Sequence, residues 1–174
     1  MPMIVWRFHV HSTSITTNSS MSPSSPDYAS AINRFETSKT VRWVDTDASG
    51  MVHTSALIRM MEETEYAFLR SRGLSVVLTD SRGMMGFPRL SAEIEIENPV
   101  GFDSEVRVQI YLMVVDGKSV CYEFLIRDEQ DATVATGKFV VAVCRFPSGE
   151  PPYAILTPEY VIEALTKPGA IVTM

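Results

Sequence analysis

Apolar and polar side chains alternate along the second half of the chain. The alternation is strict over Ser91–Glu97, Glu105–Met113 and Ser119–Arg127, and a long strand-like stretch follows from Ala132 to Phe146. Such a pattern is typical of antiparallel strands that face a core on one side and solvent on the other. Asp116-Gly117 between the second and third stretches is a hairpin signal. The pattern predicts four antiparallel strands joined by short turns.

A helical pattern precedes these strands. From about Thr54, apolar residues recur three or four positions apart up to Leu69, which predicts a helix of about five turns. Thr54 or Ser55 is the expected cap, and Gly73 follows the helix end. A light alternation over Thr40–Val44 predicts a strand before the helix, and residues 75–88 read as irregular.

The order of elements predicts the fold class. One long apolar helix followed by an antiparallel meander can bury its apolar face only by lying across the sheet. We therefore expect an α+β fold in which an antiparallel sheet wraps around one long central helix. Thr157-Pro158 is expected to open a short C-terminal helix, with Thr157 as its cap.

Composition excludes several classes of protein. Hydrophobic residues make up 45% of the 174 residues, enough for one sizeable core, and the net charge is −6 with a pI of about 5.1. Non-specific binding of nucleic acid is therefore not expected. Cys121 and Cys144 lie in predicted strands without metal-site spacing. We expect buried free thiols in a reducing, cytoplasmic protein.

The first residues differ in composition from the rest of the chain. They are rich in Ser and Thr, and we predict a disordered leader over 1–32 followed by one domain over 33–174. Met21 is a possible start of the chain. No segment approaches the roughly 18 apolar residues of a membrane span.

The stretch DTDASG, from Asp45 to Gly50, joins the predicted strand to the predicted helix. It matches the first half of an EF-hand loop, but such a loop needs an entering helix and a Glu at its twelfth place, which here is Ala56. We expect no calcium site. Two readings stay open: the acids shape a turn, or a carboxylate beside free N–H groups at the helix start performs chemistry on a carbonyl.

The same segment carries a family resemblance. Residues 41–70, VRWVDTDASGMVHTSALIRMMEETEYAFLR, resemble the signature of the hotdog-fold acyl-CoA thioesterases in the 4-hydroxybenzoyl-CoA thioesterase branch. The pattern is Asp-x-Asp-x-x-Gly-x-Val, then a helix with an acidic residue at mid-length, here Glu62, and Leu-Arg near its end. SAEIEIENPVGFDSEVRVQIYL, GKSVCYEFLIRD and ATGKFVVAV are similar to the family's later strands.

The resemblance implies a set of site residues. Asp47 matches the catalytic carboxylate, which acts as a nucleophile or as a base on water, and Asp45 matches a position that shapes the turn. Gly50 is the turn glycine. The backbone amides near His53, Thr54 and Ser55 would bind the thioester carbonyl.

Two of these positions carry alternatives. Many relatives have Tyr or Asn where this chain has His53, which leaves open whether the imidazole touches the acyl group or acts as a structural donor. Glu62 is expected to pack near the pocket. Another hotdog branch uses a helix Glu as its catalyst, but that branch lacks the turn acid, so the resemblance favours Asp47.

A CoA ester is strongly anionic, so an acidic chain needs particular cations to bind it. The candidates are Lys118, Lys138, Arg89 and Arg82, each of which also reads as an ordinary surface charge. Lys118-Ser119 ranks first, because relatives often contact the nucleotide just after this hairpin.

The resemblance implies an acyl-CoA thioesterase with no metal and no cofactor, since coenzyme A is part of the substrate. The alternatives are a hotdog dehydratase, whose usual His-with-Gly stretch is not seen, and a non-catalytic acyl-CoA binding or regulatory module on the same fold. Residues 75–90 are expected to shape the acyl pocket. One sheet around one helix also leaves an edge strand unpaired. We therefore expect a homodimer or homotetramer with sites at the subunit interface.

Overall fold

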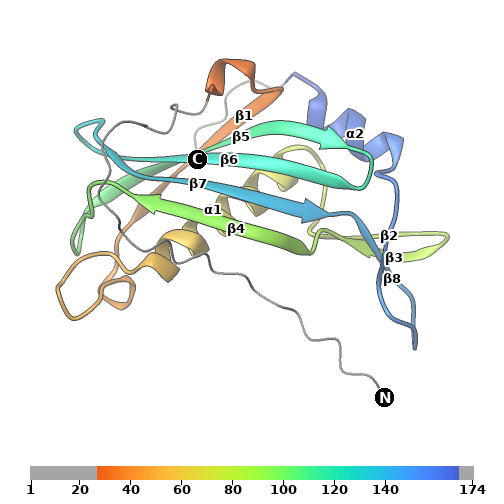
Figure 1. Ribbon diagram of the computed structural model, residues 1–174, viewed down its shortest axis with the longest axis horizontal. Helices are drawn as coiled ribbons and strands as arrows, with labels where there is room; N and C mark the ends of the chain where they lie inside the picture. Colours follow the sequence, from red (N-terminus) through yellow and green to blue (C-terminus); the bar gives the residue numbers. More distant parts are fainter. Residues whose placement is uncertain (1–26, 169–174) are drawn as a thin grey trace, which may run out of the picture.

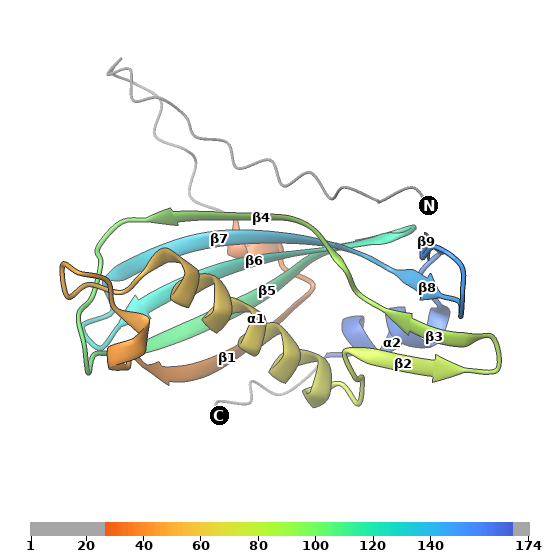
Figure 2. The ribbon, with the colours of Figure 1, turned by 90° about the horizontal axis from the view of Figure 1, so that it is seen from below.

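The computed structural model describes residues 27–168 (Figure 1). Its main layer is a five-stranded antiparallel sheet, and helix α1, Thr54–Ser71, packs across one face of that sheet (Figure 2). A smaller four-stranded sheet lies beyond the C-terminal end of α1. The predicted α+β class, a sheet wrapped around one long helix, is confirmed.

The main sheet has the order β1-β5-β6-β7-β4. The predicted meander is present, and Gly117 takes a φ of +52° in the hairpin between β5 and β6, where the left-handed region favours glycine. The strands of this sheet are β1 Asn33–Thr40, β4 Arg89–Ile96, β5 Glu105–Asp116, β6 Ser119–Asp128 and β7 Thr133–Ala142. The remaining elements are η1 Tyr28–Ser30, η2 Trp43–Asp45, β2 Val77–Asp80, β3 Gly83–Gly86, β8 Cys144–Phe146, β9 Tyr153–Ala154 and α2 Glu159–Thr166.

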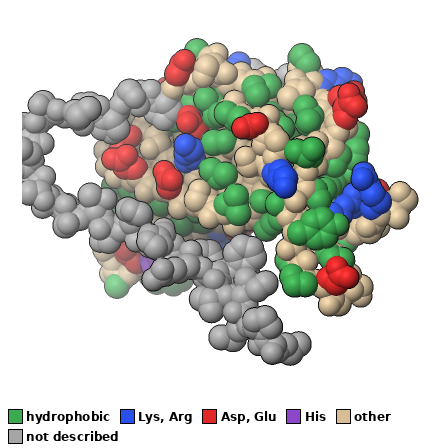
Figure 3. All heavy atoms as spheres, turned by 45° about the vertical axis from the view of Figure 1, so that its right-hand side comes forward, with side chains coloured by type: hydrophobic (Ala, Val, Ile, Leu, Met, Phe, Trp, Pro, Cys, Tyr) green, Lys and Arg blue, Asp and Glu red, His purple; other side chains and the backbone are tan. Residues whose placement is uncertain are grey.

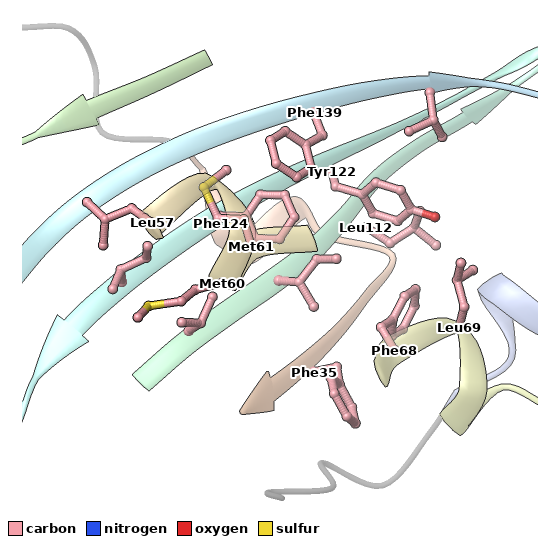
Figure 4. Close-up of a cluster of buried hydrophobic side chains, with 14 of the residues drawn as sticks. Phe35, Leu57, Met60, Met61, Phe68, Leu69, Leu112, Tyr122, Phe124 and Phe139 are labelled. Atoms are coloured by element: carbon pink, nitrogen blue, oxygen red, sulfur yellow. The ribbon is translucent and has the colours of Figure 1, made fainter. Parts of the chain in front are cut away.

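The core lies between α1 and the sheet (Figure 4). The apolar stripe of α1 is buried, and so are the inward rows of the central strands, including Tyr122, Phe124 and Phe139. Gly137 of β7 lets the helix approach closely, because a Cβ there would lie 2.4 Å from Cε of Met61. This packing fixes α1, and with it the segment that enters α1.

Three of the sequence-based predictions about strands are wrong. The strand before α1 ends at Thr40, and residues 43–45 form a 3-10 turn because the Asp45 carboxylate accepts from the Arg42 amide. Residues 75–88 are not irregular but contain the β2–β3 hairpin. The last predicted strand breaks at Val143, so that β7 stays in the main sheet while β8 pairs with β3 and β9 in the smaller one.

The predicted helix caps also need correction. The cap of α1 is His53, whose ring accepts from the Ser55 amide, rather than Thr54 or Ser55. The cap position of α2 is Pro158. The Thr157 hydroxyl instead donates to the Gly117 carbonyl, which ties the C-terminal segment to the β5–β6 hairpin.

Other predictions concern the cysteines and the chain's first residues. Both cysteines are free; Cys144 is buried and Cys121 is half-buried. Residues 1–26, including Met21, lie outside the described part, so the leader stays a prediction. Tyr28 in η1 stacks on Tyr111 with ring centroids 4.3 Å apart. Among residues 27–168, we find no helix with both the length and the apolar character of a membrane span.

Candidate active site

The site is built on the turn between β1 and α1. Thr46 and Val52 form an isolated antiparallel bridge, and inside it the Asp47 amide donates to the Met51 carbonyl at 2.9 Å. The Gly50 amide donates to the Asp47 carbonyl at 3.0 Å, and Gly50 has a φ of +80°, so a side chain there would be strained. The predicted turn glycine therefore closes a short, well-bonded loop.

Asp47 presents its carboxylate on the outside of this loop. The carboxylate accepts from the Ser49 amide at 2.8 Å and from the Ser49 hydroxyl at 2.5 Å, and the residue is exposed. The Ser49 hydroxyl bond and the Ser49 amide bond hold the pKa of Asp47 below its usual value. Asp47 is therefore ionised at neutral pH, the state required of a nucleophile or a general base.

The helix start offers one free amide rather than three. The His53 amide donates to the Asp45 carbonyl at 2.7 Å, and the Ser55 amide donates to Nδ1 of His53 at 3.1 Å. Among residues 27–168, the Thr54 amide has no hydrogen-bond partner. The predicted carbonyl-binding set of His53, Thr54 and Ser55 thus narrows to Thr54.

His53 acts as a cap in this structure. Nδ1 of its ring lies 2.8 Å from the Ser55 hydroxyl in addition to accepting from the Ser55 amide. An Nδ1 that accepts an N–H bond belongs to a neutral ring whose proton is on Nε2. The ring therefore has a structural task at the helix start, and its Nε2–H remains a donor on an exposed side chain.

Glu62 and Arg89 meet in a cluster at the middle of α1. Arg89 reaches from β4 to Glu62 at 2.9 Å and to Glu65 at 2.6 Å, and its guanidinium lies 3.6 Å from the centre of the Phe139 ring. Both of its ion pairs are inside the subunit. Arg89 is therefore committed to two carboxylates, and we leave it out of the CoA-contacting residues that we propose below.

Glu65 is the buried acid of this cluster, with 1% of its surface exposed. Burial raises the pKa of Glu65 to about 7, although the Arg89 charge works in the opposite direction. The Tyr122 hydroxyl is also buried and has no hydrogen-bond partner among the described residues. The sequence pattern did not single out Glu65 or Tyr122, because each occupies an ordinary inward-facing position of its element.

From the raised pKa of Glu65 we predict how the stability of the fold depends on pH. An acid whose pKa is raised by folding stabilises the fold below its unfolded value of 4.5, and this contribution is lost as the pH rises through about 7. We expect Glu65→Gln to remove about 1–3 kcal/mol of the decrease in unfolding free energy between pH 5 and pH 8. Urea unfolding of both proteins at pH 5 and at pH 8 measures this change in the unfolding free energy. Glu129→Gln, at an exposed turn, is the control, and an unchanged pH dependence in Glu65→Gln would contradict the prediction.

The predicted CoA-binding cations lie away from the turn of the same chain. Lys118 and Ser119 are in the β5–β6 hairpin, whereas the turn adjoins the opposite end of β5, where the Val41 amide donates to the Ser104 carbonyl. The 12 residues of β5 span about 35–40 Å. Arg82 is exposed in the β2–β3 turn at the same end as Lys118 (Figure 1). One chain therefore does not bring these cations to Asp47.

Lys138 faces outward from the middle of β7. Its cross-strand partners are Glu93 of β4 and Glu123 of β6, and the three line a hollow of about 460 Å³ on the outer face of the sheet. With Glu95, three carboxylates and one lysine line this hollow, which makes it a poor site for an anionic nucleotide. Within the described residues, His, Cys, Asp and Glu side chains form no group of three that could hold a metal.

An apolar pocket lies beyond the C-terminal end of α1. It has a volume of about 260 Å³ and is lined by Val76, Val77, Met84, Met85, Gly86, Phe87, Pro88 and Phe146. All but Phe146 belong to the stretch expected to shape an acyl pocket. The face that includes this end of the molecule shows hydrophobic side chains interspersed with charged side chains of both signs (Figure 3). The 18 residues of α1, about 27 Å of helix, separate the pocket from the turn of the same chain.

Comparison with known proteins bears on this geometry. The family model of the thioesterase-like superfamily matches residues 41–159, which include the turn, α1 and the whole meander. The chain belongs to this superfamily. The match confirms the resemblance read from the turn motif and places the chain in a family of thioester hydrolases.

Individual relatives are more distant. A curated protein of Aquifex aeolicus described as "Putative esterase" is 26% identical over 125 residues, which cover 72% of this chain and 92% of that protein. A 1,4-dihydroxy-2-naphthoyl-CoA thioesterase from Synechocystis aligns with a TM-score of 0.67 at 19% identity, over 78% of this chain and 97% of the other. A mutant 4-hydroxybenzoyl-CoA thioesterase in complex with 4-hydroxybenzoyl-CoA aligns with a TM-score of 0.66 at 13% identity, over 76% and 99%. These structures confirm the hotdog fold.

Proposed function

We propose that the protein is an acyl-CoA thioesterase that hydrolyses a CoA thioester to a free carboxylic acid and coenzyme A. One observation carries the proposal: a single short loop joins an ionised carboxylate, Asp47, to a helix start whose Thr54 amide is free. Family membership supports the same reaction class. The solved CoA thioesterases with this fold are consistent with a CoA ester as substrate.

The chemistry follows from these two groups. The Thr54 N–H donates to the thioester oxygen and stabilises the negative charge that develops on it. In one route, Asp47 attacks the carbonyl carbon, the C–S bond breaks, and CoA leaves as a thiolate that takes up a proton; water then hydrolyses the resulting anhydride. In the other route, Asp47 removes a proton from a water molecule that attacks the carbonyl carbon; the C–S bond then breaks, and the proton passes from Asp47 to the departing CoA thiolate. Both routes give the acid, free CoA and a regenerated carboxylate.

We further propose that the working unit is a homodimer joined through β4. This strand is an edge of the main sheet, and an unpaired edge is a liability in a single subunit. β4 begins directly after Phe87 and Pro88, which line the apolar pocket. Its end leads to Gly101, which forms a bridge with Met51 of the turn. A two-fold pairing of two β4 edges would therefore bring each apolar pocket beside the Asp47 turn of the other subunit.

The same arrangement accounts for the binding of an anionic substrate. The β5–β6 hairpin lies at the pocket end of the subunit, because the Val143 amide donates to the Lys118 carbonyl where β7 passes into β8. In the dimer, Lys118 and Ser119 would come to the partner's turn together with the pocket. We propose that the acyl group enters the apolar pocket and that Lys118 attracts the phosphates of CoA.

A panel of acyl-CoA esters with a thiol-release readout tests the proposed reaction. We expect release of CoA from at least one ester with an apolar or aromatic acyl group, because the proposed pocket is lined mainly by apolar side chains. Calorimetric binding of the same esters without thiol release would instead indicate the non-catalytic binding module. If no ester is cleaved and none is bound, both functions are contradicted.

A further inference from the structure

The turn that carries Asp47 contains a second acid, and this one is buried. Asp45 has 3% of its surface exposed. One carboxylate oxygen accepts from the Arg42 amide at 2.9 Å, and the other accepts from the guanidinium of Arg59 on α1. The Arg42 side chain is 68% exposed, and its Nε lies 3.7 Å from Asp45. Arg59 is therefore the principal cation that stabilises the buried charge.

Asp45 lies where the turn closes on the helix. Its backbone carbonyl accepts from the His53 amide at 2.7 Å. This bond lies next to the Thr46–Val52 bridge, since Asp45 precedes Thr46 and His53 follows Val52. Asp47 follows Asp45 by two residues, and Thr54 follows His53 by one. A displacement of Asp45 would therefore change the position of the catalytic carboxylate relative to the free amide.

Arg59 is itself held from the other side. Its second terminal nitrogen donates to Glu63 at 2.6 Å, and Glu63 accepts from Lys39 of β1 at 2.8 Å. The bonds to Glu63 and Asp45 raise the pKa of Arg59, and the bonds from Lys39 and Arg59 lower the pKa of Glu63. Arg59 and Glu63 therefore keep their charges at neutral pH. This series of ion pairs connects β1, α1 and the turn. At its centre is the planar guanidinium of Arg59, which donates in two fixed directions.

We propose that Arg59 is a positioning residue for the reaction and that it acts through buried Asp45 to hold the Asp47 turn against the start of α1. The inference rests on the proposed function, because it assumes that Asp47 and Thr54 act together. A misplacement of about 1 Å at a reacting group can cost roughly 100-fold in rate. Since Arg59 contacts neither the apolar pocket nor Lys118, its loss should lower kcat and leave KM nearly unchanged.

The experiment compares Arg59→Met, Asp45→Asn and their combination with Arg70→Met, which removes an exposed arginine from the last turn of the same helix. All rates are measured well below the melting temperature of each variant. We expect Arg59→Met to lower kcat about 10- to 50-fold with KM within about threefold, while Arg70→Met stays near wild type. The double variant should lose no more activity than the less active of the two single variants, because the Arg59–Asp45 contact is already absent in each of them.

Hydrogen exchange gives a second readout that does not depend on turnover. In Arg59→Met, the amides of Asp47 and His53 should exchange faster, while amides in the middle of α1 keep their protection. Wild-type kcat in Arg59→Met, additive losses in the double variant, or unchanged exchange at both amides would each overturn the inference. Full activity in Asp47→Asn would overturn the proposed function instead, so the two failures are distinguishable.

Discussion

Replacement of Asp47 by Asn is expected to lower kcat by at least about 100-fold, a low-end value for the loss of acid–base chemistry. The exchange removes the charge and nucleophilicity but keeps an oxygen that can accept from the Ser49 amide, as the carboxylate does at 2.8 Å. The backbone bonds from Asp47 to Met51 and from Gly50 to Asp47 do not involve the side chain. The loop should therefore keep its shape while the chemistry is lost.

The control for this variant is Asp103→Asn. Asp103 is exposed, and its φ of +68° is one that Asn also tolerates, so the exchange alters charge near the turn without touching it. Steady-state rates on the best ester of the panel, with circular dichroism for folding, make the comparison. Activity of Asp47→Asn within about threefold of wild type would show that another group carries the reaction.

The pH dependence of the wild-type rate tests the same residue. The bonds from Ser49 lower the pKa of Asp47, so the carboxylate stays charged as the pH falls towards its ordinary value of 3.8. The midpoint of any loss of activity caused by protonation of this group should therefore lie below that value. A rate that falls between pH 7 and pH 5 would identify a different titrating group, and buried Glu65, with a pKa of about 7, is the first to examine by Glu65→Gln.

The alternation of apolar and polar residues was enough to predict α1 and four strands of the main sheet, β4 to β7, but not β1, which shares only Thr40 with the strand predicted over residues 40–44. In β5 and β6 the inward row is apolar and buried over most of its length, which makes the alternation clear. The smaller sheet was not predicted, because β3 and β8 have only four and three residues, too few to show an alternating pattern. The break at Val143 was missed for a related reason: apolar residues continue through it while the chain passes from one sheet to the other.

The sequence motif was enough to locate the candidate site, but the hydrogen bonds within the site could not be predicted from the sequence. Three helix-start amides look equivalent in the sequence, and two of them are occupied only because His53 caps the helix and Asp45 turns its carbonyl towards His53. Arg89 reads as a surface cation until its pairing with Glu62 and Glu65 is seen. Arg59 lies on the polar side of an amphipathic helix, where nothing in the pattern distinguishes it from Arg70.

Mixing two inactive variants should restore activity if the sites are shared between subunits. One chain carries Asp47→Asn and has an intact pocket. The other keeps Asp47 but carries Val77→Trp, which fills the apolar pocket from a position that is 53% exposed, together with Lys118→Glu, which reverses the charge proposed for CoA. Each parent dimer lacks one half of every site.

In a mixed dimer, the intact Asp47 of the second chain would face the intact pocket and Lys118 of the first. Random exchange of equal amounts gives half mixed dimers, each with one working site of two, so about one quarter of wild-type activity should return. If each site is instead complete within one chain, no combination restores it, and the activity of the mixture stays at the mean of the parents. A protein that light scattering shows to be monomeric and that is fully active would contradict the shared site directly, because the pocket-lining β2–β3 hairpin and the turn before α1 lie at opposite ends of α1 (Figure 2).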